Sequence, residues 1–137
     1  MPQVSFYTLS EKRALETFVC QLTAKISDQG EHRLLILAKD QQQQEKVDER
    51  LWTFSDVSFI PHSTEASAQE AVVIHLDTNN TSCDVLMNLS GELPGKTGSF
   101  SKILEIVSSK PEDKQNARQR YRYYQEQGYE LEHHEIA

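Results

Sequence analysis

The sequence predicts an α/β fold: a three-layer α/β/α sandwich around a mostly parallel, mixed central sheet. Strand-like and helix-like segments alternate along the chain without internal repeats, which is typical of this architecture. Residues 34–38 form an unbroken apolar run, as expected for a strand that helices cover on both faces. The length of 137 residues suits one hydrophobic core, which typically serves about 100–150 residues. We therefore expect a single domain over residues 1–137.

The first half of the chain follows a strand, helix, strand, helix order. Residues 4–9 indicate a first strand, and Ser10 stands where a helix N-cap is expected, so a helix should follow at once. That helix should end at Gly30, and Asp40 can cap a second helix over residues 41–52, whose glutamines form a solvated face. The first helix carries one apolar stripe, formed by Leu15, Phe18, Val19, Leu22 and Ile26.

The second half continues the alternation. Residues 58–62 predict a brief extended segment, residues 63–69 a polar loop, and residues 71–76 and 85–89 two further strands. A last helix should begin near Pro111 and reach its C-cap at Gly128, and a strand over residues 129–133 should close the domain. Between these segments, helical spacing predicts another helix on Phe100, Ile103, Leu104 and Val107.

Composition places the chain among folded, well-hydrated domains, with 37% hydrophobic and 26% charged residues. No apolar stretch approaches the roughly 20 residues that span a bilayer, and residues 1–12 lack the pattern of a signal peptide. We therefore expect a cytoplasmic protein without a membrane partner. Cys20 and Cys83 lack metal-ligand or CxxC spacing, which predicts two buried thiols.

The charge distribution is uneven. The net charge of −7 disfavours a general nucleic-acid binder, because phosphate binding depends on Lys and Arg displacing counterions. Residues 110–123 nevertheless hold five basic and two acidic residues, a local charge of +3, so the rest of the chain carries −10. A basic island on an acidic protein predicts a local anionic partner, because the remaining surface repels a polyanion.

No motif supports catalysis, a cofactor or a metal. Residues 91–97 resemble a phosphate-binding loop, but only three residues separate the first glycine from Gly-Lys, and Pro94 removes one backbone donor. The five histidines show no ligand spacing, and His133-His134 is typical of an exposed pair. We therefore expect a non-enzymatic protein with no cofactor and no metal site.

The helix that begins at Pro111 offers the first candidate site. At about 100° per residue, five of its residues fall within an arc of about 100°. One interpretation is a solvated charged face with Tyr121 and Tyr124 partly buried against the sheet. The other is a cleft for an acidic peptide, in which guanidinium groups bind carboxylates and an aromatic lines a pocket. The five residues are Lys114, Arg118, Tyr121, Arg122 and Gln125.

The second candidate is a group of large apolar residues: Leu51-Trp52 with Phe59, Ile60 and Pro61. Trp52 is the only tryptophan of the chain. It either packs in the core or is an exposed anchor for a protein partner, since tryptophan is enriched at interfaces.

Several short motifs occur together along the chain: Phe6-Tyr7, Cys20, Asp48-Glu49-Arg50-Leu51-Trp52, Ser58-Phe59-Ile60-Pro61-His62, residues 86–89, and Ala117-Arg118-Gln119-Arg120-Tyr121 through Gly128-Tyr129. Together these features resemble the chi subunit of the bacterial DNA polymerase III holoenzyme, a clamp-loader component, almost from end to end. The chain departs from the family at Ala71, where proline is usual, and at Gln125, where a basic residue can stand.

The resemblance implies a non-enzymatic adaptor in DNA replication with two partners. One is the psi subunit of DNA polymerase III, bound by Trp52, Phe59 and Pro61. The other is the acidic C-terminal tail of single-stranded-DNA-binding protein, which ends in a phenylalanine carboxylate; Gln125 removes one charge from its site. The implied tail-binding residues are Val107, Lys114, Arg118, Tyr121 and Arg122.

Three alternatives stay open. The protein could bind single-stranded nucleic acid directly through its basic C-terminal helix, with Tyr121, Tyr123 and Tyr124 as stacking platforms. It could be a small nucleotide-binding enzyme, although it lacks a proper phosphate loop. A damage-response helicase could also compete for the surface formed by Trp52, Phe59 and Pro61, which we call the Trp52 face. No sequence-specific contact to nucleic acid is expected.

Overall fold

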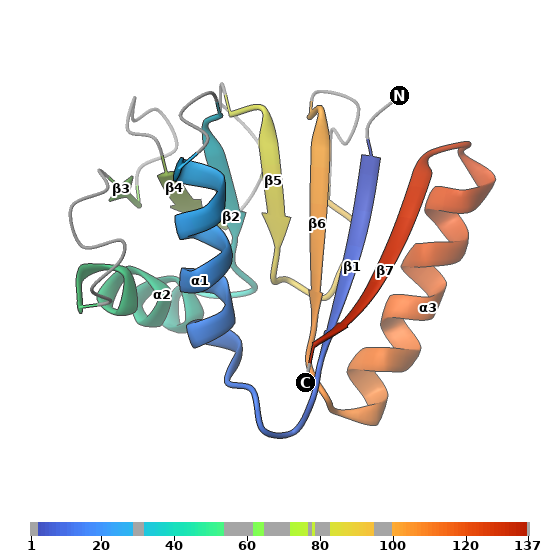
Figure 1. Ribbon diagram of the computed structural model, residues 1–137, viewed down its shortest axis with the longest axis horizontal. Coiled ribbons are helices and arrows are strands. Elements are labelled where there is room, and N and C mark those ends of the chain that lie inside the picture. Colours follow the sequence, from blue (N-terminus) through green and yellow to red (C-terminus); the bar gives the residue numbers. More distant parts are fainter. Residues whose placement is uncertain are drawn as a thin grey trace.

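Three central strands of the sheet, residues 34–37, 85–88 and 102–107, are short and rich in leucine, isoleucine and valine, and almost all of their residues are buried. The computed structural model describes residues 3–28, 32–53, 62–64, 72–76, 78, 83–94 and 100–136. Within these ranges seven strands form one sheet in the order β3-β4-β2-β5-β6-β1-β7, shown in Figure 1. The strands are β1 (Gln3–Leu9), β2 (Leu34–Leu37), β3 (His62–Ser63), β4 (Val72–His75), β5 (Val85–Asn88), β6 (Lys102–Val107) and β7 (Glu130–Ile136).

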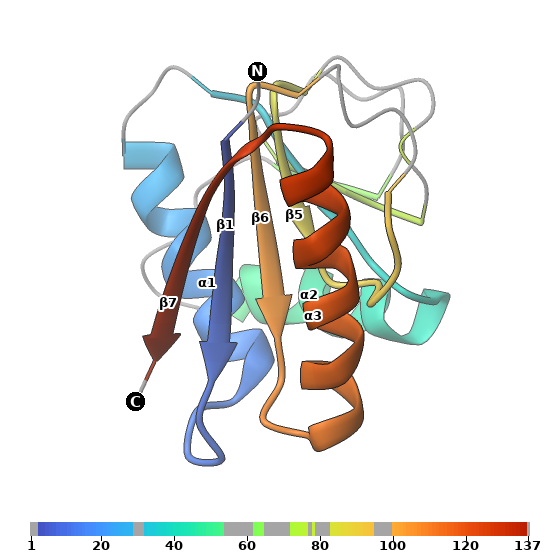
Figure 2. The same ribbon diagram turned by 90° about the vertical axis from the view of Figure 1, so that its right-hand side faces the viewer.

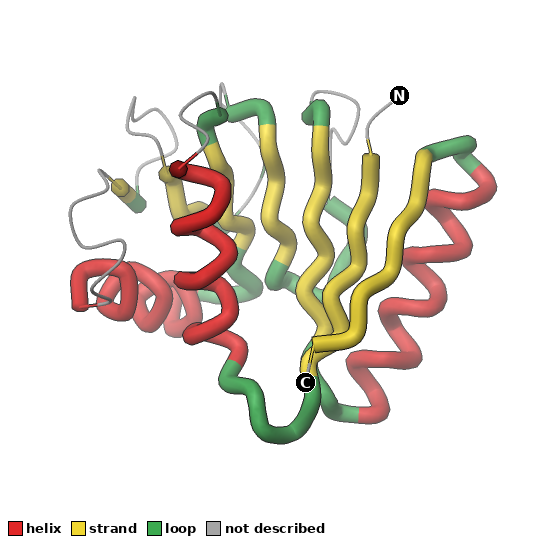
Figure 3. The backbone as a smooth tube through the Cα atoms, viewed as in Figure 1, coloured by secondary structure: helices red, strands yellow, loops and turns green. Residues whose placement is uncertain are grey.

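Helices cover both faces of the sheet. Buried side chains that include Phe18 and Leu51 join α1 and α2 to one face, and a second cluster that includes Phe6 and Tyr124 joins α3 to the other. Figures 2 and 3 show this arrangement, with α3 beside the β7 end of the sheet. The three-layer α/β sandwich is confirmed, and every strand pairing found in the described ranges is parallel. The helices of the described ranges are α1 (Leu15–Asp28), α2 (Gln41–Thr53) and α3 (Pro111–Glu126).

Most helix ends lie where capping residues predict them. The Asp40 carboxylate accepts a hydrogen bond of 2.8 Å from the backbone N–H of Gln43, which caps α2. Pro111 opens α3, and Gly128 follows its end with a φ of 83°. The expected N-cap at Ser10 is wrong: its hydroxyl accepts from the N–H of Lys12 in a turn, and α1 begins only at Leu15.

The helix predicted around residues 100–107 is wrong as well. This segment is β6, which lies between β5 and β1 and is buried over its last five residues. A strand covered on both faces is apolar at almost every position, so residues 100–107, which lie in and just before β6, also fit a helical spacing. The consequence is that Glu105 lies inside the molecule, at 0% exposure.

Several expected features fall outside the described residues. These are the end of the first helix at Gly30, most of the extended segment 58–62 and the loop 63–69, and Ala71. No helix in the described ranges is long and apolar enough to cross a bilayer.

Candidate functional site

An open cavity of about 270 Å³ lies between α3 and the adjoining strands β1 and β7. We call it the α3 groove. A second cavity of about 380 Å³ continues it toward the carboxyl ends of these strands and shares Thr8, Lys114 and Glu135 with it. The α3 groove is lined by Phe6, Thr8, Lys114, Ala117, Arg118, Tyr121, His133 and Glu135.

The register of the two strands places their side chains in this groove. β1 and β7 pair in parallel, with Phe6 opposite His133 and Thr8 opposite Glu135. Because side chains alternate along a strand, these four point to the same face of the sheet. The Thr8 hydroxyl and His133 Nε2 lie 3.0 Å apart and form a hydrogen bond across the strand pair.

The floor of the α3 groove is apolar. Phe6 is 2% exposed, and its ring centroid lies 5.3 Å from that of the partly buried Tyr121. Ala117 is buried one turn earlier on α3, where its small side chain leaves space above the sheet. An aromatic or aliphatic group that enters the groove would therefore lose water on an aromatic surface, which is favourable.

The wall formed by α3 is cationic. Lys114 and Arg118 are exposed, one helical turn apart, and neither side chain makes an ion pair with any described residue. Glu135 is the one acidic side chain among the residues that line the groove. The arrangement of an apolar floor beside free cations can bind the carboxylate and side chain of a peptide.

The structure brings together three of the five residues expected to bind the tail. Lys114, Arg118 and Tyr121 line the α3 groove. Arg122 is exposed one turn beyond Arg118 but does not line the cavity. Val107 is 2% exposed and lines a different cavity, of about 300 Å³, at the carboxyl ends of the central strands.

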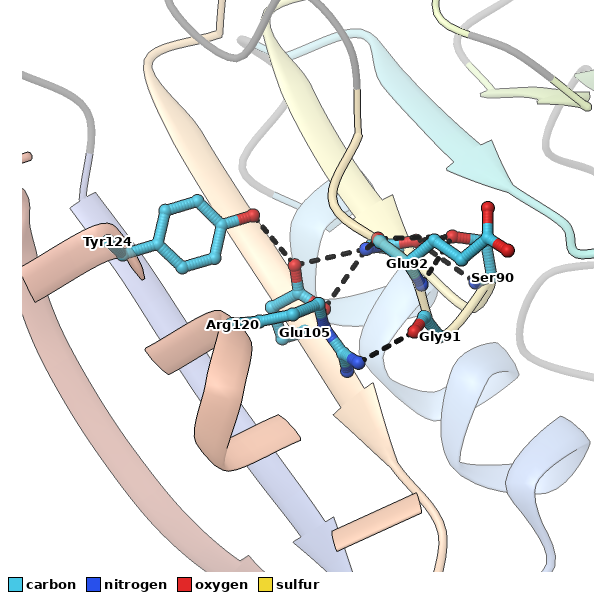
Figure 4. Close-up of polar contacts among 7 residues, drawn as sticks. Ser90, Gly91, Glu92, Glu105, Arg120 and Tyr124 are labelled. Carbon is cyan, nitrogen blue, oxygen red and sulfur yellow. Dashed lines mark hydrogen bonds and ion pairs between the residues drawn. The ribbon is translucent and has the colours of Figure 1, made fainter. Parts of the chain in front are cut away.

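Arg120, counted in the basic island, points to the opposite side of α3 and is 5% exposed. Its Nε donates to Glu105 Oε1 at 3.1 Å, and its Nη1 donates to the carbonyl of Gly91 at 2.9 Å. Figure 4 shows these contacts. The exposed basic surface of α3 is therefore smaller than the charge count suggested.

Glu105 is the centre of a buried polar network. The Tyr124 hydroxyl donates to its Oε2 at 2.8 Å, and the Asn88 amide donates at 3.0 and 3.1 Å. Burial raises the pKa of Glu105, and the cation of Arg120 with these donors opposes the rise. Since each neighbour donates, the network is satisfied with Glu105 as a carboxylate. It ties α3 to β5 and β6, and so it fixes which face of α3 turns toward the α3 groove.

The tyrosines of α3 are not equivalent. Tyr124 is 0% exposed, between Phe6 and Tyr129, whereas Tyr123 is 39% exposed. Burial and the neighbouring Glu105 raise the pKa of Tyr124 far above its ordinary value. Tyr124 therefore cannot act as a stacking platform for single-stranded nucleic acid. Direct binding of nucleic acid by α3 would have only two of the three expected tyrosines, Tyr121 and Tyr123, available for stacking.

Trp52 lies at the end of α2 and is 58% exposed, whereas its neighbour Leu51 is 1% exposed. The core-packing interpretation of Trp52 is thus wrong. Phe59 and Pro61, expected beside it, lie outside the described residues.

The remaining candidates are the cysteines and the histidine pair. Cys20 and Cys83 are buried thiols, as predicted, and burial raises the pKa of Cys20, which disfavours the reactive thiolate. His133 and His134 are both exposed, as expected. Among the described residues, no cluster of three or more His, Cys, Asp or Glu side chains is placed to hold a metal ion.

Comparison with known proteins identifies the family. A model of the family "DNA polymerase III chi subunit, HolC" matches residues 1–132. The chain belongs to this chi-subunit family. It is 36% identical to the DNA polymerase III subunit chi of Pseudomonas aeruginosa, with 99% of this chain and 98% of the relative aligned. The chi subunits of Haemophilus influenzae (33%, 92% of each chain) and Escherichia coli (27%, 96% of each chain) are similar over nearly their full lengths. As a member of the family of DNA polymerase III chi subunits, the protein belongs to DNA replication.

Sequence reasoning missed the part of the α3 groove formed by the sheet. Phe6, Thr8, His133 and Glu135 come from opposite ends of the chain, and only the pairing of β1 with β7 brings them together. The usable signal was the alternation of His133 and Glu135 in the last segment, which places both on one face of a strand.

Proposed function

We propose that this protein is a non-catalytic subunit of the DNA polymerase III clamp-loader complex that connects two other proteins. The α3 groove binds the acidic C-terminal tail of single-stranded-DNA-binding protein, and the Trp52 face binds the psi subunit. The observation that carries the first assignment is the α3 groove itself, where exposed Lys114 and Arg118 stand beside an apolar floor of Phe6 and Tyr121.

The tail's chemistry fits both parts of the groove. Its terminal phenylalanine ring can bury itself against Phe6 and Tyr121, while its carboxylates accept hydrogen bonds from Arg118 and Lys114. A charge-assisted hydrogen bond contributes about 1.5–3 kcal/mol, and burying a phenylalanine side chain contributes a similar amount. After the cost of association, a few such contacts give micromolar binding, or about −8 kcal/mol.

The test is a calorimetric titration with an N-acetylated acidic peptide that ends in phenylalanine. Arg118→Ala should lower the affinity at least about tenfold, since it removes a charge-assisted contact. Lys46→Ala is the matched control, because it removes an exposed cation from α2 on the other face of the sheet and so changes the net charge equally. Unchanged affinity in Arg118→Ala, with the fold intact by circular dichroism, would refute the tail site.

Binding should also weaken with salt. The cations of the groove are exposed, and charges in water are screened within about 10 Å at 0.1 M salt. A peptide that kept the same affinity from 50 to 500 mM NaCl would not depend on these cations.

The exposure of Trp52 supports the second assignment. Large apolar side chains on a surface are typical anchors for protein partners. Trp52→Ala should abolish co-purification with psi while leaving peptide binding at the α3 groove unchanged, because Trp52 and the groove lie on different elements. Retention of psi by this variant would contradict the assignment.

A further inference from the structure

The α3 groove contains a histidine that the bridging role does not explain. His133 lies on β7 directly opposite Phe6, and its ring lines the cavity together with Arg118 and Lys114. The next residue, His134, points to the other face of the sheet, where its ring stacks on Tyr7 at 5.0 Å. The two adjacent histidines therefore have separate environments, and only one of them faces the site.

The hydrogen bonding of His133 leaves one ring nitrogen available. Nε2 lies 3.0 Å from the Thr8 hydroxyl, and Nδ1 has no hydrogen-bond partner among the described residues. In the protonated imidazole both nitrogens donate, so Nε2 can keep its bond to Thr8 while Nδ1–H donates to a ligand. In the neutral ring Nε2 can accept from the Thr8 hydroxyl while Nδ1–H still donates to a ligand, but that hydrogen bond carries no charge and is weaker than the one from the protonated ring.

The charges around His133 come from two elements. From α3, Lys114 and Arg118 place positive charge in the cavity that the His133 ring lines, and Tyr121 lines it as well. From β7, Glu135 places negative charge there. β1 contributes Phe6 and Thr8, which do not titrate in the physiological range. An acidic peptide that enters the groove adds negative charge beside His133 and so tips this balance toward the protonated ring.

We propose that His133 is a pH-dependent specificity residue of the α3 groove, which takes up a proton and donates a third charged hydrogen bond when an acidic, carboxylate-terminated peptide binds. This inference rests on the proposed tail-binding function. Imidazole changes charge between about pH 5 and 8, so the groove gains affinity for its anionic ligand on mild acidification. The acidic side chain of Glu135 also lines the groove and acts against an anionic ligand.

The experiment is a titration of the N-acetylated acidic peptide ending in phenylalanine into the full chain at pH 6 and pH 8. The wild type should bind about two- to fivefold more tightly at pH 6, which is the effect of one partly exposed charge pair. His133→Gln keeps a side chain that can hydrogen-bond to Thr8, and its affinity should be nearly equal at the two pH values. His134→Gln is the matched control, because it removes the neighbouring histidine from the opposite face, and it should keep the wild-type pH dependence.

A second measurement follows proton uptake directly. Titrations near pH 7 in two buffers of different ionisation enthalpy give the number of protons taken up on binding, and we expect a positive fraction below one for the wild type and about zero for His133→Gln. Glu135→Gln should bind about two- to threefold more tightly at both pH values, since it removes the anion of the groove.

The outcomes separate this inference from the function on which it rests. If the wild type does not bind the peptide, or if Arg118→Ala binds it as well as the wild type does, the tail-binding function fails. If the peptide binds and Arg118→Ala weakens it, but His133→Gln keeps the wild-type pH dependence and proton uptake, then the role of His133 is overturned and the tail-binding function stands.

Discussion

Arginines on the two sides of α3 have different environments and different roles. Arg118 faces the α3 groove, is exposed, and has no ion-pair partner among the described residues. Arg120, two residues later, is 5% exposed and bonded to Glu105 and to the carbonyl of Gly91. Two residues correspond to about 200° of helical rotation, so the side chains point to nearly opposite sides.

This comparison shows that the basic residues of α3 have two different roles, one in binding and one in folding. A cation available to a partner must stay solvated, and it contributes little to folding. A cation inside the molecule must be fully paired, because an unpaired buried charge costs several kcal/mol. The buried side of α3 sets the orientation of the helix, and that orientation presents Lys114 and Arg118 to the groove.

The largest effect should come from removing the buried cation. Arg120→Ala should lower the free energy of unfolding by about 3–5 kcal/mol, because it leaves Glu105 buried without its cation. Arg118→Ala is the matched variant on the exposed side and should change stability by less than about 0.5 kcal/mol. Urea unfolding of both variants checks this, and equal stabilities would contradict the division of α3 into two sides.

The loss of unfolding free energy caused by Arg120→Ala should depend on pH. Burial already raises the pKa of Glu105, and loss of Arg120 raises it further. A folded-state pKa above the unfolded value of about 4.3 means that the folded protein holds the proton more tightly, so stability falls as pH rises through this window. The deficit relative to the wild type should therefore be smaller at pH 5 than at pH 8, in unfolding experiments at the two pH values.

Removing one neutral hydrogen-bond donor from the network around Glu105 should lower the free energy of unfolding by a smaller amount. Tyr124→Phe deletes the hydroxyl that bonds Glu105 at 2.8 Å and keeps the ring against Phe6 and Tyr129. We expect a loss of about 1–2 kcal/mol, the cost of leaving a buried acceptor one bond short. Tyr123→Phe, at an exposed neighbouring position, is the control, and thermal unfolding distinguishes the two.

The smallest effect concerns Asp84, a partly buried carboxylate, in contrast to the fully buried Glu105. Burial tends to raise the pKa of Asp84, but hydrogen bonds from His32 and from the N–H of Arg33, each 2.7 Å, outweigh it and hold the pKa below its ordinary value. Asp84 thus adds stability above its unfolded pKa of about 3.9, which is lost as pH falls through the lower folded value.

Asp84→Asn should therefore lose less stability than the wild type between pH 5 and pH 2, as followed by urea unfolding. Glu126→Gln removes an exposed carboxylate from the end of α3 and should retain the wild-type acid dependence. An identical acid dependence in Asp84→Asn and the wild type would show that this carboxylate is not coupled to folding.

Part of the candidate site was predictable because it lies on one helix. Pro111 and Gly128 mark the ends of α3, and the spacing of Lys114, Arg118 and Tyr121 places them on one side of it. The fate of Arg120 was not predictable in the same way. Helical spacing predicts a helix for the segment that contains its partner Glu105, and only the sheet shows that residues 102–107 form a central strand with both faces covered.

The sequence by itself determined the α/β class, the caps of α2 and α3, and the row of exposed cations on α3, because all of these depend on residues within a few turns of one another. The tertiary structure alone decided that β1 pairs with β7, which joins Thr8 to His133 across 125 residues and forms the floor of the α3 groove. Local periodicity gives the face on which a side chain lies, but the neighbour it meets depends on the order of strands in the sheet.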